Sequence, residues 1–364
     1  MIRLLCIAGA RPNFVKIAPL HRAFSAHPGL ESRIVHTGQH YDRRMSDLFF
    51  EQLGLPEPDL HLGVGSGSHA RQTAAVMEAL EPVLMEDRPD AVVVVGDVNS
   101  TLAAALTAVK LHIPVAHVEA GLRSGDRGMP EEINRLATDA ISDLCYVSEP
   151  SGMAHLRAEG VPESRIVFAG NVMIDSLVAI REQARVVGQA KAMGLSGPFA
   201  LVTLHRPATV DQADTLARAV DYLEELAASL PIVMPMHPRT RGCLESHGLL
   251  ERLQAISGIL VASPMGYLEF MSLMLDAALV FTDSGGIQEE TTFLGIPCLT
   301  MRPSTERPVT VTEGTNELFP LGSTGLTEKA RAVLSGRWKA GRIPEGWDGK
   351  AAERIAAHLA ETLG

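Results

Sequence analysis

The chain has 364 residues, of which 46% are hydrophobic and 21% are charged. This balance is typical of a globular protein and excludes a disordered or fibrous chain, and the length indicates two domains. The 43 acidic residues outnumber the 32 lysines and arginines, which gives a formal net charge of -11. Because nucleic-acid-binding proteins concentrate positive charge, we expect no nucleic-acid partner, and any bound phosphate should occupy a local pocket.

The four cysteines are widely separated, and no two of them form a C-x-x-C pair. This spacing favours reduced, buried thiols over a zinc site or a disulfide scaffold. No apolar run approaches the ~18 residues that a membrane span needs, and the first apolar run is too short for the core of a signal peptide. We therefore expect a cytoplasmic protein with no membrane partner and no bound metal.

Short apolar runs alternate with helical patterns along the whole chain. In the first half, strands are predicted at residues 2–8, 32–37, 91–95, 114–118, 143–147 and 165–169, and helices at 14–26, 42–53, 70–86, 100–111 and 131–141. In the second half, a long helix over 172–193 precedes strands at 199–203, 232–236, 258–261, 277–281 and 297–300, and a last helix covers 351–363. Continuous apolar strands are typical of a parallel sheet that is covered on both faces.

These patterns predict an α/β protein with two Rossmann-like, doubly wound parallel-sheet domains that face a cleft. The segment Gly194-Leu195-Ser196-Gly197-Pro198 is the clearest break before the second series of strands. We place the N-terminal domain at residues 1–170 and the C-terminal domain at 171–364. The terminal helix fits either domain.

Ligands of open parallel sheets bind beyond the carboxyl ends of the strands, so the residues that follow each strand are the candidates. The first strand leads to Gly9-Ala10-Arg11-Pro12-Asn13, with Lys16 in the first turn of the next helix. Arg11 and Lys16 beside a helix N-terminus predict an anion site. The strand at 91–95 leads to Gly96-Asp97, where Asp97 is a candidate acid–base group and Asn99 or Ser100 is expected to cap the following helix.

The next strand places His117 and Glu119 on one face, with Glu119 at the rim and His117 interpreted as a core histidine. Glu119 and Asp97 form a candidate pair whose pKa values are pushed apart for acid–base work. Glu131 lies in the first turn of a helix, where the helix dipole explains a glutamate and where it can pair with Arg135 four residues later. A catalytic role for Glu131 is the alternative.

In the second half, His205 and Arg206 follow a strand, where such a pair can protonate and hold a departing phosphate; a plain polar loop is the alternative. The segment 282–290 contains the clearest signal. Ser284 is expected to cap a helix whose first turn holds Gly285 and Gly286, so that a phosphate can approach bare N–H groups.

Glu290 lies one helical turn beyond Gly286 and suits ribose hydroxyls, while Arg302 and Arg307 downstream supply guanidinium groups. Together with the glycine-flanked turn, these residues predict a site for a nucleoside diphosphate. The segment Gly65-Ser66-Gly67-Ser68-His69-Ala70 matches a relaxed dinucleotide pattern, but it lacks a convincing strand before it, and we expect no nicotinamide there. This architecture suits a nucleotide-sugar glycosyltransferase as well as other enzymes of nucleotide sugars.

Six segments taken together resemble the non-hydrolysing UDP-N-acetylglucosamine 2-epimerases. They are Gly-Ala-Arg-Pro-Asn at 9–13, Gly-Asp-Val-Asn-Ser-Thr at 96–101, His-Val-Glu-Ala-Gly-Leu-Arg at 117–123, Pro-Glu-Glu-Ile-Asn-Arg at 130–135, Asp-Ser-Gly-Gly-Ile-Gln-Glu-Glu at 283–290 and Thr-Glu-Arg-Pro at 305–308. The likeness covers nearly the whole chain, in order. It implies a glycosyltransferase-B-like fold, a homodimer, no metal or nicotinamide, and reversible epimerisation of a UDP-sugar at C2 through elimination and re-addition of UDP.

The resemblance also implies roles for particular side chains. It assigns the catalytic groups to Asp97, Glu119, Glu131 and His205. It assigns UDP and substrate binding to Arg11, Lys16, Ser284, Gly285, Gly286, Glu290 and Arg307, with Glu290 on the ribose.

Two segments depart from the family pattern. Bacterial members carry Gly-His-Arg-Arg-Glu-Asn where this chain has Leu-His-Arg-Pro-Ala-Thr at 204–209, and Gln-His-Arg-Glu where it has Gln-His-Tyr-Asp at 39–42. Residues near both segments bind a second, activating substrate molecule in those members, so substrate activation is not expected here. A UDP-sugar glycosyltransferase, a hydrolysing relative and a non-catalytic sensor of nucleotide sugars are the alternatives, and the retained catalytic side chains argue against the sensor.

Overall fold

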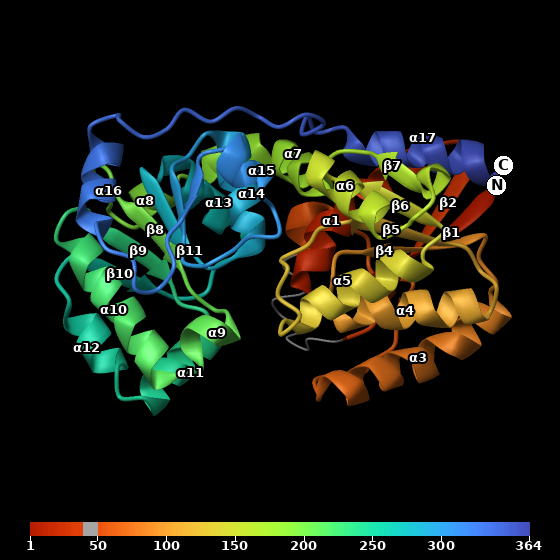
Figure 1. The fold of residues 1–364 in the computed structure, drawn as a ribbon, viewed down its shortest axis with the longest axis horizontal. Coiled ribbons are helices and arrows are strands. Elements are labelled where there is room, and N and C mark those ends of the chain that lie inside the picture. The colour runs from red at the N-terminus through yellow and green to blue at the C-terminus, as the bar shows by residue number, and fades with distance from the viewer. Residues whose placement is uncertain (39–49) are drawn as a thin grey trace. The chain divides into compact units, whose positions relative to one another are not determined.

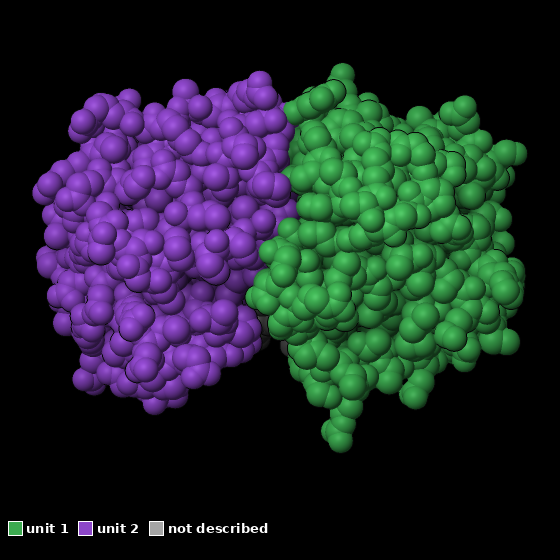
Figure 2. Space-filling model, in the orientation of Figure 1, with its two compact units in different colours: residues 1–179, 345–364 green, residues 180–344 purple. Residues whose placement is uncertain are grey.

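The computed structural model describes residues 1–38 and 50–364, and these form two compact units (Figure 2). Unit 1 contains Met1–Ala179 and Glu345–Gly364, and unit 2 contains Ile180–Pro344. Each unit has one parallel β-sheet with helices packed against it (Figure 1). Most of the helix predicted over 42–53 lies outside the described residues.

The sheet of unit 1 has seven parallel strands in the order β3-β2-β1-β4-β5-β6-β7. The strands are β1 (Ile2–Ala8), β2 (Leu30–His36), β3 (Leu60–His61), β4 (Ala91–Val95), β5 (Val115–Ala120), β6 (Leu144–Val147) and β7 (Ile166–Phe168). The chain builds outward from β1 to β3 and then returns to continue on the other side of β1. The strand order therefore reverses between β1 and β4, which is where open α/β sheets bind ligands.

Helices cover the sheet of unit 1 on both faces. They are α1 (Arg11–Ala26), α3 (His69–Glu86), α4 (Asn99–Lys110), α5 (Pro130–Ile141), α6 (Pro150–Ala158), α7 (Val172–Val187), which crosses into unit 2, and α17 (Ala351–Leu363). The helices α3, α4 and α5 pack side by side, and α1 packs on α17 (Figure 1). All five residues of β4 are buried, as a strand covered on both faces requires.

The terminal helix α17 belongs to unit 1, a point that the sequence left open. Its own N-cap residue, Lys350, makes no side-chain capping bond to any residue that the structure describes. Instead Asp175 of α7 accepts hydrogen bonds from the backbone N–H groups of Ala351 and Ala352, at 3.1 and 2.7 Å. Because the first N–H groups of a helix lack partners within it, this carboxylate satisfies two of them and fastens α17 to the unit.

The sheet of unit 2 has six parallel strands in the order β10-β9-β8-β11-β12-β13, so its order reverses between β8 and β11. The strands are β8 (Ala200–Thr203), β9 (Ile232–Pro235), β10 (Ile259–Ala262), β11 (Leu279–Thr282), β12 (Cys298–Thr300) and β13 (Asn316–Leu318). The helices are α8 (Gln189–Ala192), α9 (Pro207–Val210), α10 (Ala213–Ala227), α11 (Pro238–Ser246), α12 (Leu250–Ala255), α13 (Tyr267–Asp276), α14 (Gly285–Leu294), α15 (Val309–Thr312) and α16 (Leu326–Leu334).

Several elements differ from the sequence prediction, which contained neither the edge strand β3 nor the helix α6. The single helix expected over 172–193 is broken at Gly188, whose φ of 59° lies in the left-handed region and separates α7 from α8. The edge strand β13 was not predicted, because its three residues Asn316, Glu317 and Leu318 contain no continuous apolar run. Among the residues that the structure describes, no helix has both the length and the apolar character that crossing a membrane demands.

Candidate functional site

The turn after β4 lies at the point where the strand order of unit 1 reverses. Asn13 at the start of α1 accepts hydrogen bonds from the N–H groups of Gly9 and Ala10, both at 3.0 Å, and donates to the carbonyl of Val95 at 3.0 Å. One side chain therefore ties the β1–α1 turn to the end of β4. Gly96 has a φ of +66°, and the Nζ of a neighbouring lysine lies 3.0 Å from where its Cβ would be, so glycine suits this position.

Asp97 follows that glycine and is held by α5. Its Oδ2 lies 2.6 Å from Nη1 of Arg135, and its backbone carbonyl accepts a hydrogen bond from Nδ2 of Asn134 at 2.9 Å. The Asp97 side chain is 25% exposed, whereas that of Arg135 is 2% exposed. The carboxylate is thus fixed from its buried side by a guanidinium and keeps an accessible side.

Glu119 occupies a strained backbone position at the end of β5. Its φ is +73°, and the register between β5 and β6 shifts between Val118 and Ala120. A left-handed conformation is costly for a glutamate, and such strain is concentrated at functional sites. Its carboxylate forms a buried ion pair with Lys16 of α1. The structure therefore brings Lys16 and Glu119 together, as neighbours of the Gly96 turn.

The two glutamates that begin α5 have different environments. Glu131 is half-buried, whereas Glu132 is buried, accepts hydrogen bonds from the N–H groups of Ser124 and Gly125, and pairs with Arg135 at 3.0 Å. Burial opposes ionisation, but these bonds and the guanidinium hold the pKa of Glu132 below its usual value. The partner of Arg135 on this helix is therefore Glu132, three residues before it, and not Glu131 as the spacing suggested.

Two further expectations for unit 1 concern the cap of α4 and the side chain of Arg11. The residue at the N-cap of α4 is Val98, and it makes no side-chain capping bond. Asn99 instead donates to Gln72 at 2.8 Å, and Ser100 bonds Thr37 at 2.8 Å, so the expected capping by Asn99 or Ser100 is wrong. Arg11 is the first residue of α1, but its side chain lies outside the described part of the structure.

In unit 2, the helix α14 begins directly after β11, at the second point of strand-order reversal. Ser284 is its N-cap residue, but within the described residues its side chain makes no capping bond, contrary to expectation. A Cβ added to Gly285 would lie 2.7 Å from Nη1 of Arg307 and 2.7 Å from Oε1 of Glu306. A larger residue at this position would therefore have to displace the ends of these two charged side chains.

A buried charge cluster surrounds this helix start. Glu306 pairs with Arg302 at 2.7 Å, Arg307 at 2.5 Å and Arg206 at 3.5 Å, and Arg307 also pairs with Glu289 at 2.9 Å. Burial opposes ionisation of Glu306, but the guanidinium groups hold its pKa well below the usual range. Three guanidinium groups therefore gather next to the N–H groups of α14. This arrangement favours an anion.

His205 is joined to the same helix start through Asp283, which is fully buried. The Asp283 carboxylate accepts hydrogen bonds from the backbone N–H groups of His205 and Arg206, at 3.0 and 2.9 Å, and its Oδ1 lies 3.4 Å from Nδ1 of His205. Burial lowers the pKa of His205. The positive charges of Arg206 and Arg239 also lower this pKa, whereas the negative charge of Asp283 raises it. Asp283 thus connects the turn after β8 to the turn after β11, a role that the sequence interpretation missed.

Glu290 lies buried on α14, and its Oε1 accepts a hydrogen bond from the hydroxyl of Tyr267 at 2.7 Å. Burial raises the pKa of Glu290 to about 7, and the Tyr267 hydrogen bond partly opposes this shift. A carboxyl with this pKa changes between hydrogen-bond acceptor and donor near neutral pH. Tyr267 begins α13 and was not among the site residues that the sequence predicted.

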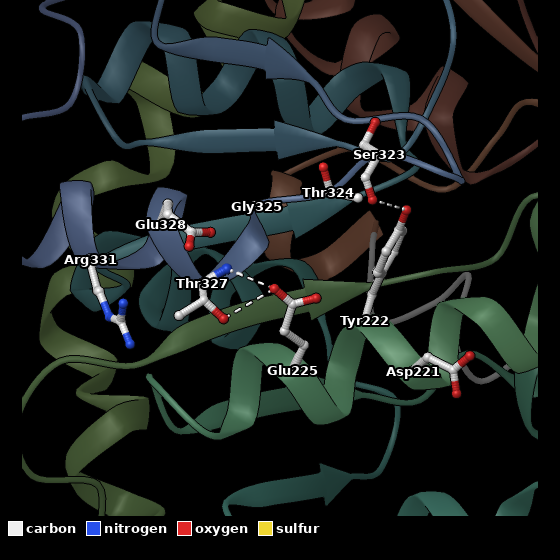
Figure 3. Close-up of a pocket in the computed structure, with 9 residues that line it drawn as sticks. All are labelled: Asp221, Tyr222, Glu225, Ser323, Thr324, Gly325, Thr327, Glu328 and Arg331. Atoms are coloured by element: carbon white, nitrogen blue, oxygen red, sulfur yellow. Dashed lines mark hydrogen bonds between the residues drawn. The ribbon is translucent and has the colours of Figure 1, made fainter.

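A separate pocket of about 540 Å³ lies on unit 2, between α10 and the start of α16 (Figure 3). Glu225 accepts hydrogen bonds from the N–H and the hydroxyl of Thr327 there, both at 3.0 Å, and Tyr222 donates to the carbonyl of Ser323 (Figure 3). The pocket contains none of the predicted site residues. Its acidic residues Asp221, Glu225 and Glu328 make it unlike the anion-favouring start of α14.

Most of the remaining site residues that the sequence interpretation missed lie on α5. Glu132, Asn134, Arg135, Thr138 and Asp139 are all buried. Glu132, Arg135 and Asp139 recur at spacings of three and four residues, which is the spacing of one helix face. A helix whose buried face carries ionisable side chains is the signal that would have found them.

Comparisons with known proteins point to one family. The family model described as UDP-N-acetylglucosamine 2-epimerase matches residues 22–360. A UDP-2,3-diacetamido-2,3-dideoxy-D-glucuronate 2-epimerase of Pseudomonas aeruginosa is 42% identical over 99% of this chain and 100% of its own. The crystal structure of Methanocaldococcus jannaschii UDP-GlcNAc 2-epimerase, in complex with UDP-GlcNAc and UDP, superposes with a TM-score of 0.90 at 39% identity, covering 99% of this chain and 100% of that one.

The glycotransferase of kitacinnamycin superposes with a TM-score of 0.59 at 14% identity, covering 100% of this chain and 99% of that one. This is a likeness of fold alone, and it confirms the expected glycosyltransferase-B-like class of two parallel-sheet domains. The match of the family model over most of the chain, and the identity with full-length relatives, together show that this chain belongs to the UDP-N-acetylglucosamine 2-epimerase family.

Proposed function

We propose that this protein reversibly epimerises UDP-N-acetylglucosamine at C2, giving UDP-N-acetylmannosamine. The observation that carries the proposal is the carboxylate site of unit 1, where Asp97 is fixed by Arg135 and Glu119 is held in a left-handed conformation against Lys16. Two precisely held carboxylates next to one turn suit the removal and return of a proton. Family membership supplies the sugar nucleotide on which they act.

The chemistry explains why both an acid–base site and an anion site are needed. The C2 proton has no adjacent carbonyl, so its removal alone would leave an unstabilised carbanion. If the C1–O bond breaks as the proton leaves, the bond's electron pair departs with UDP and the C2–H electrons form the C1=C2 double bond of a 2-acetamidoglucal. UDP then adds back to C1 while C2 receives a proton on the opposite face. Both steps develop charge that a preorganised polar site must stabilise.

In this proposal the residues of each unit have distinct tasks. Asp97 and Glu119 handle the C2 proton on opposite faces of the sugar, and Glu131 supports this transfer. In unit 2, His205 assists the departing phosphate. The helix start formed by Ser284, Gly285 and Gly286, together with Arg11 and Arg307, holds the diphosphate, and Glu290 binds the ribose. Lys16 contributes to substrate binding.

Incubation with UDP-N-acetylglucosamine in deuterated water, followed by NMR of the products, tests the proposal. We expect deuterium at C2 in both epimeric UDP-sugars. A glycosyltransferase would incorporate no deuterium, a hydrolysing relative would release free N-acetylmannosamine, and a sensor would return the substrate unchanged. The Asp97→Asn variant is the matched control: it should lose C2 exchange and retain UDP binding, and exchange by this variant would refute the role of Asp97.

The relative from Pseudomonas aeruginosa favours a second candidate substrate, a UDP-2,3-diacetamido uronate, for the same C2 chemistry. The two substrates offered together in deuterated water, at equal concentration, compete for one site. The ratio of their exchange rates equals the ratio of their kcat/KM values and identifies the preferred sugar.

From the family resemblance we also infer a cytoplasmic homodimer. Light scattering on the purified protein tests the oligomeric state, and a monomeric mass would overturn that part of the proposal.

A further inference from the structure

His117 is a fully buried side chain on β5 with a hydrogen-bond acceptor at each ring nitrogen. Its Nε2 lies 2.8 Å from the carbonyl oxygen of Gly96, and its Nδ1 lies 2.6 Å from Oδ1 of Asp139. A carbonyl oxygen can only accept a hydrogen bond, so Nε2 must carry a hydrogen and donate. His117 is therefore more than a core residue, because it holds the backbone of a particular turn.

The side chains behind His117 fix its orientation. Asp139 of α5 also accepts a hydrogen bond from the N–H of Gly121 at 3.0 Å and pairs with Arg123 at 2.7 Å, and Arg123 pairs in turn with Glu159 at 2.6 Å. Burial opposes ionisation of Asp139, but His117 and Arg123 hold its pKa below the usual value. The charges alternate in sign from Glu159 through Arg123 to Asp139. A carboxylate anchored in this way keeps the imidazole ring in one orientation.

The turn that His117 holds contains the proposed acid–base residue Asp97. The N–H of Gly96 donates to the carbonyl of Val118 at 3.0 Å, and the carbonyl of Gly96 accepts from His117 at 2.8 Å. Both polar atoms of Gly96 are thus held by β5, the strand that carries Glu119. The carbonyl of Gly96 belongs to the peptide group that leads into Asp97, so its direction sets the backbone from which the Asp97 side chain starts.

We propose that His117 is a positioning residue which, through its bond to the Gly96 carbonyl, sets the direction from which Asp97 approaches the C2 proton; this inference rests on the proposed epimerase function. Arg135 holds the far end of the Asp97 side chain, and His117 holds its backbone origin. Asp97 is then constrained at both ends. The loss of the His117 bond should therefore disturb the reaction step more than substrate binding, because small displacements of a reacting group are costly.

Two amide variants separate the two bonds of His117. In His117→Gln, the amide nitrogen reaches the region of Nε2 and can still donate to Gly96. In His117→Asn, the shorter amide reaches only the region of Nδ1, on the side of Asp139. We expect the Asn variant to lose about 100-fold in kcat with the Kd for UDP unchanged within twofold, and the Gln variant to recover most of that loss. Equal kcat values for the two variants, or a loss in the Asn variant matched by weaker UDP binding, would overturn the inference.

Two further measurements test the role of His117 and need no enzyme activity. A wild-type protein that lacks epimerase activity would refute the proposed function, and these two measurements would still test the role of His117. In crystal structures, the Gly96 carbonyl should turn away and the Asp97–Arg135 contact should lengthen in the Asn variant only. An unmoved carbonyl in that variant contradicts the inference. In the wild-type protein labelled with ¹⁵N-histidine, the ring signal that disappears in His117→Gln should carry a proton on Nε2. An unprotonated Nε2 overturns the inference even if the Asn variant does not fold.

Discussion

The ion pair between Lys16 and Glu119 should show strong energetic coupling, because both side chains are buried, at 7% and 4% exposure. Lys16→Met leaves the glutamate charge buried without its partner, and Glu119→Gln leaves the lysine charge in the same state. Removing one member of a buried pair costs about 3–5 kcal/mol. Replacing both members removes both charges, so the double variant should be no less stable than either single variant. The coupling energy is therefore expected to be at least about 3 kcal/mol.

The two tryptophans of the chain allow this cycle to be measured within unit 1. Trp347 is buried in unit 1, and Trp338 belongs to unit 2. In a Trp338→Phe background, urea unfolding followed by fluorescence reports on Trp347 alone. The Trp338→Phe protein is the reference for the two single variants and the double variant. All four proteins lack the hydrogen bond that Trp338 donates, so its loss cancels in the comparison.

The result that would refute this reasoning is additivity. If the losses of the two single variants sum to that of the double variant within about 0.5 kcal/mol, Lys16 and Glu119 do not stabilise one another. The left-handed backbone at Glu119 does not confuse the comparison, since glutamine bears the same strain as glutamate.

Three further predictions follow from positions with matched controls. Gly121→Ala should lower the free energy of unfolding in urea by about 3 kcal/mol or more, because the added Cβ would lie 2.4 Å from the Gly152 carbonyl and the φ is +80°. Gly125→Ala is the control: its φ is +73°, but its Cβ would meet no described atom within 4 Å, so it should cost about 1 kcal/mol. Equal losses of stability in the two variants would contradict this reasoning. Asp175→Ala removes the cap of α17 and should lower the free energy of unfolding by about 1–2 kcal/mol. Burial raises the pKa of Asp175 to about 6, and Asp175→Asn keeps a hydrogen-bond acceptor without the charge, so this variant should lose less stability. Identical thermal shifts for the two variants would show that the cap is unimportant. Burial raises the pKa of Glu290 to about 7, so the ionised fraction of this carboxyl falls about tenfold from pH 8 to pH 6. The affinity for UDP, measured by calorimetry, should weaken by about the same factor over this range, relative to the Glu290→Gln variant. Parallel pH profiles for the two proteins would show that Glu290 does not bind the ribose.

Most strands of the sheets could be predicted because their signals are local. The runs that became β4, β8 and β11 are apolar up to their last residue, and this pattern needs no knowledge of neighbouring strands. The strand β13 could not be found in this way, since Asn316-Glu317-Leu318 becomes a strand only by pairing with β12 at the edge of the sheet.

The candidate site was predicted only in part, because the sequence selected individual residues but not the residues that they contact. The rule that ligands bind beyond the strand ends selected Asp97, Glu119 and His205. The structure places Asp97 and His205 just after β4 and β8, whereas Glu119 lies within β5, one residue before its end. Their partners were not predicted. Arg135 was expected beside Glu131 but pairs with Asp97 and Glu132, and Asp283 was seen only as part of a motif although it binds the turn of His205.

The sequence by itself determined most of the strands, their alternation with helices, the family, and the segments in which polar side chains follow a strand, because hydrophobic period and motif spacing are properties of consecutive residues. Only the tertiary structure decided which polar groups pair with one another, such as Lys16 with Glu119 and His117 with the carbonyl of Gly96. A buried polar group takes whichever complementary group the packing of strands and helices brings within hydrogen-bond distance, and that distance is set between segments far apart in the chain.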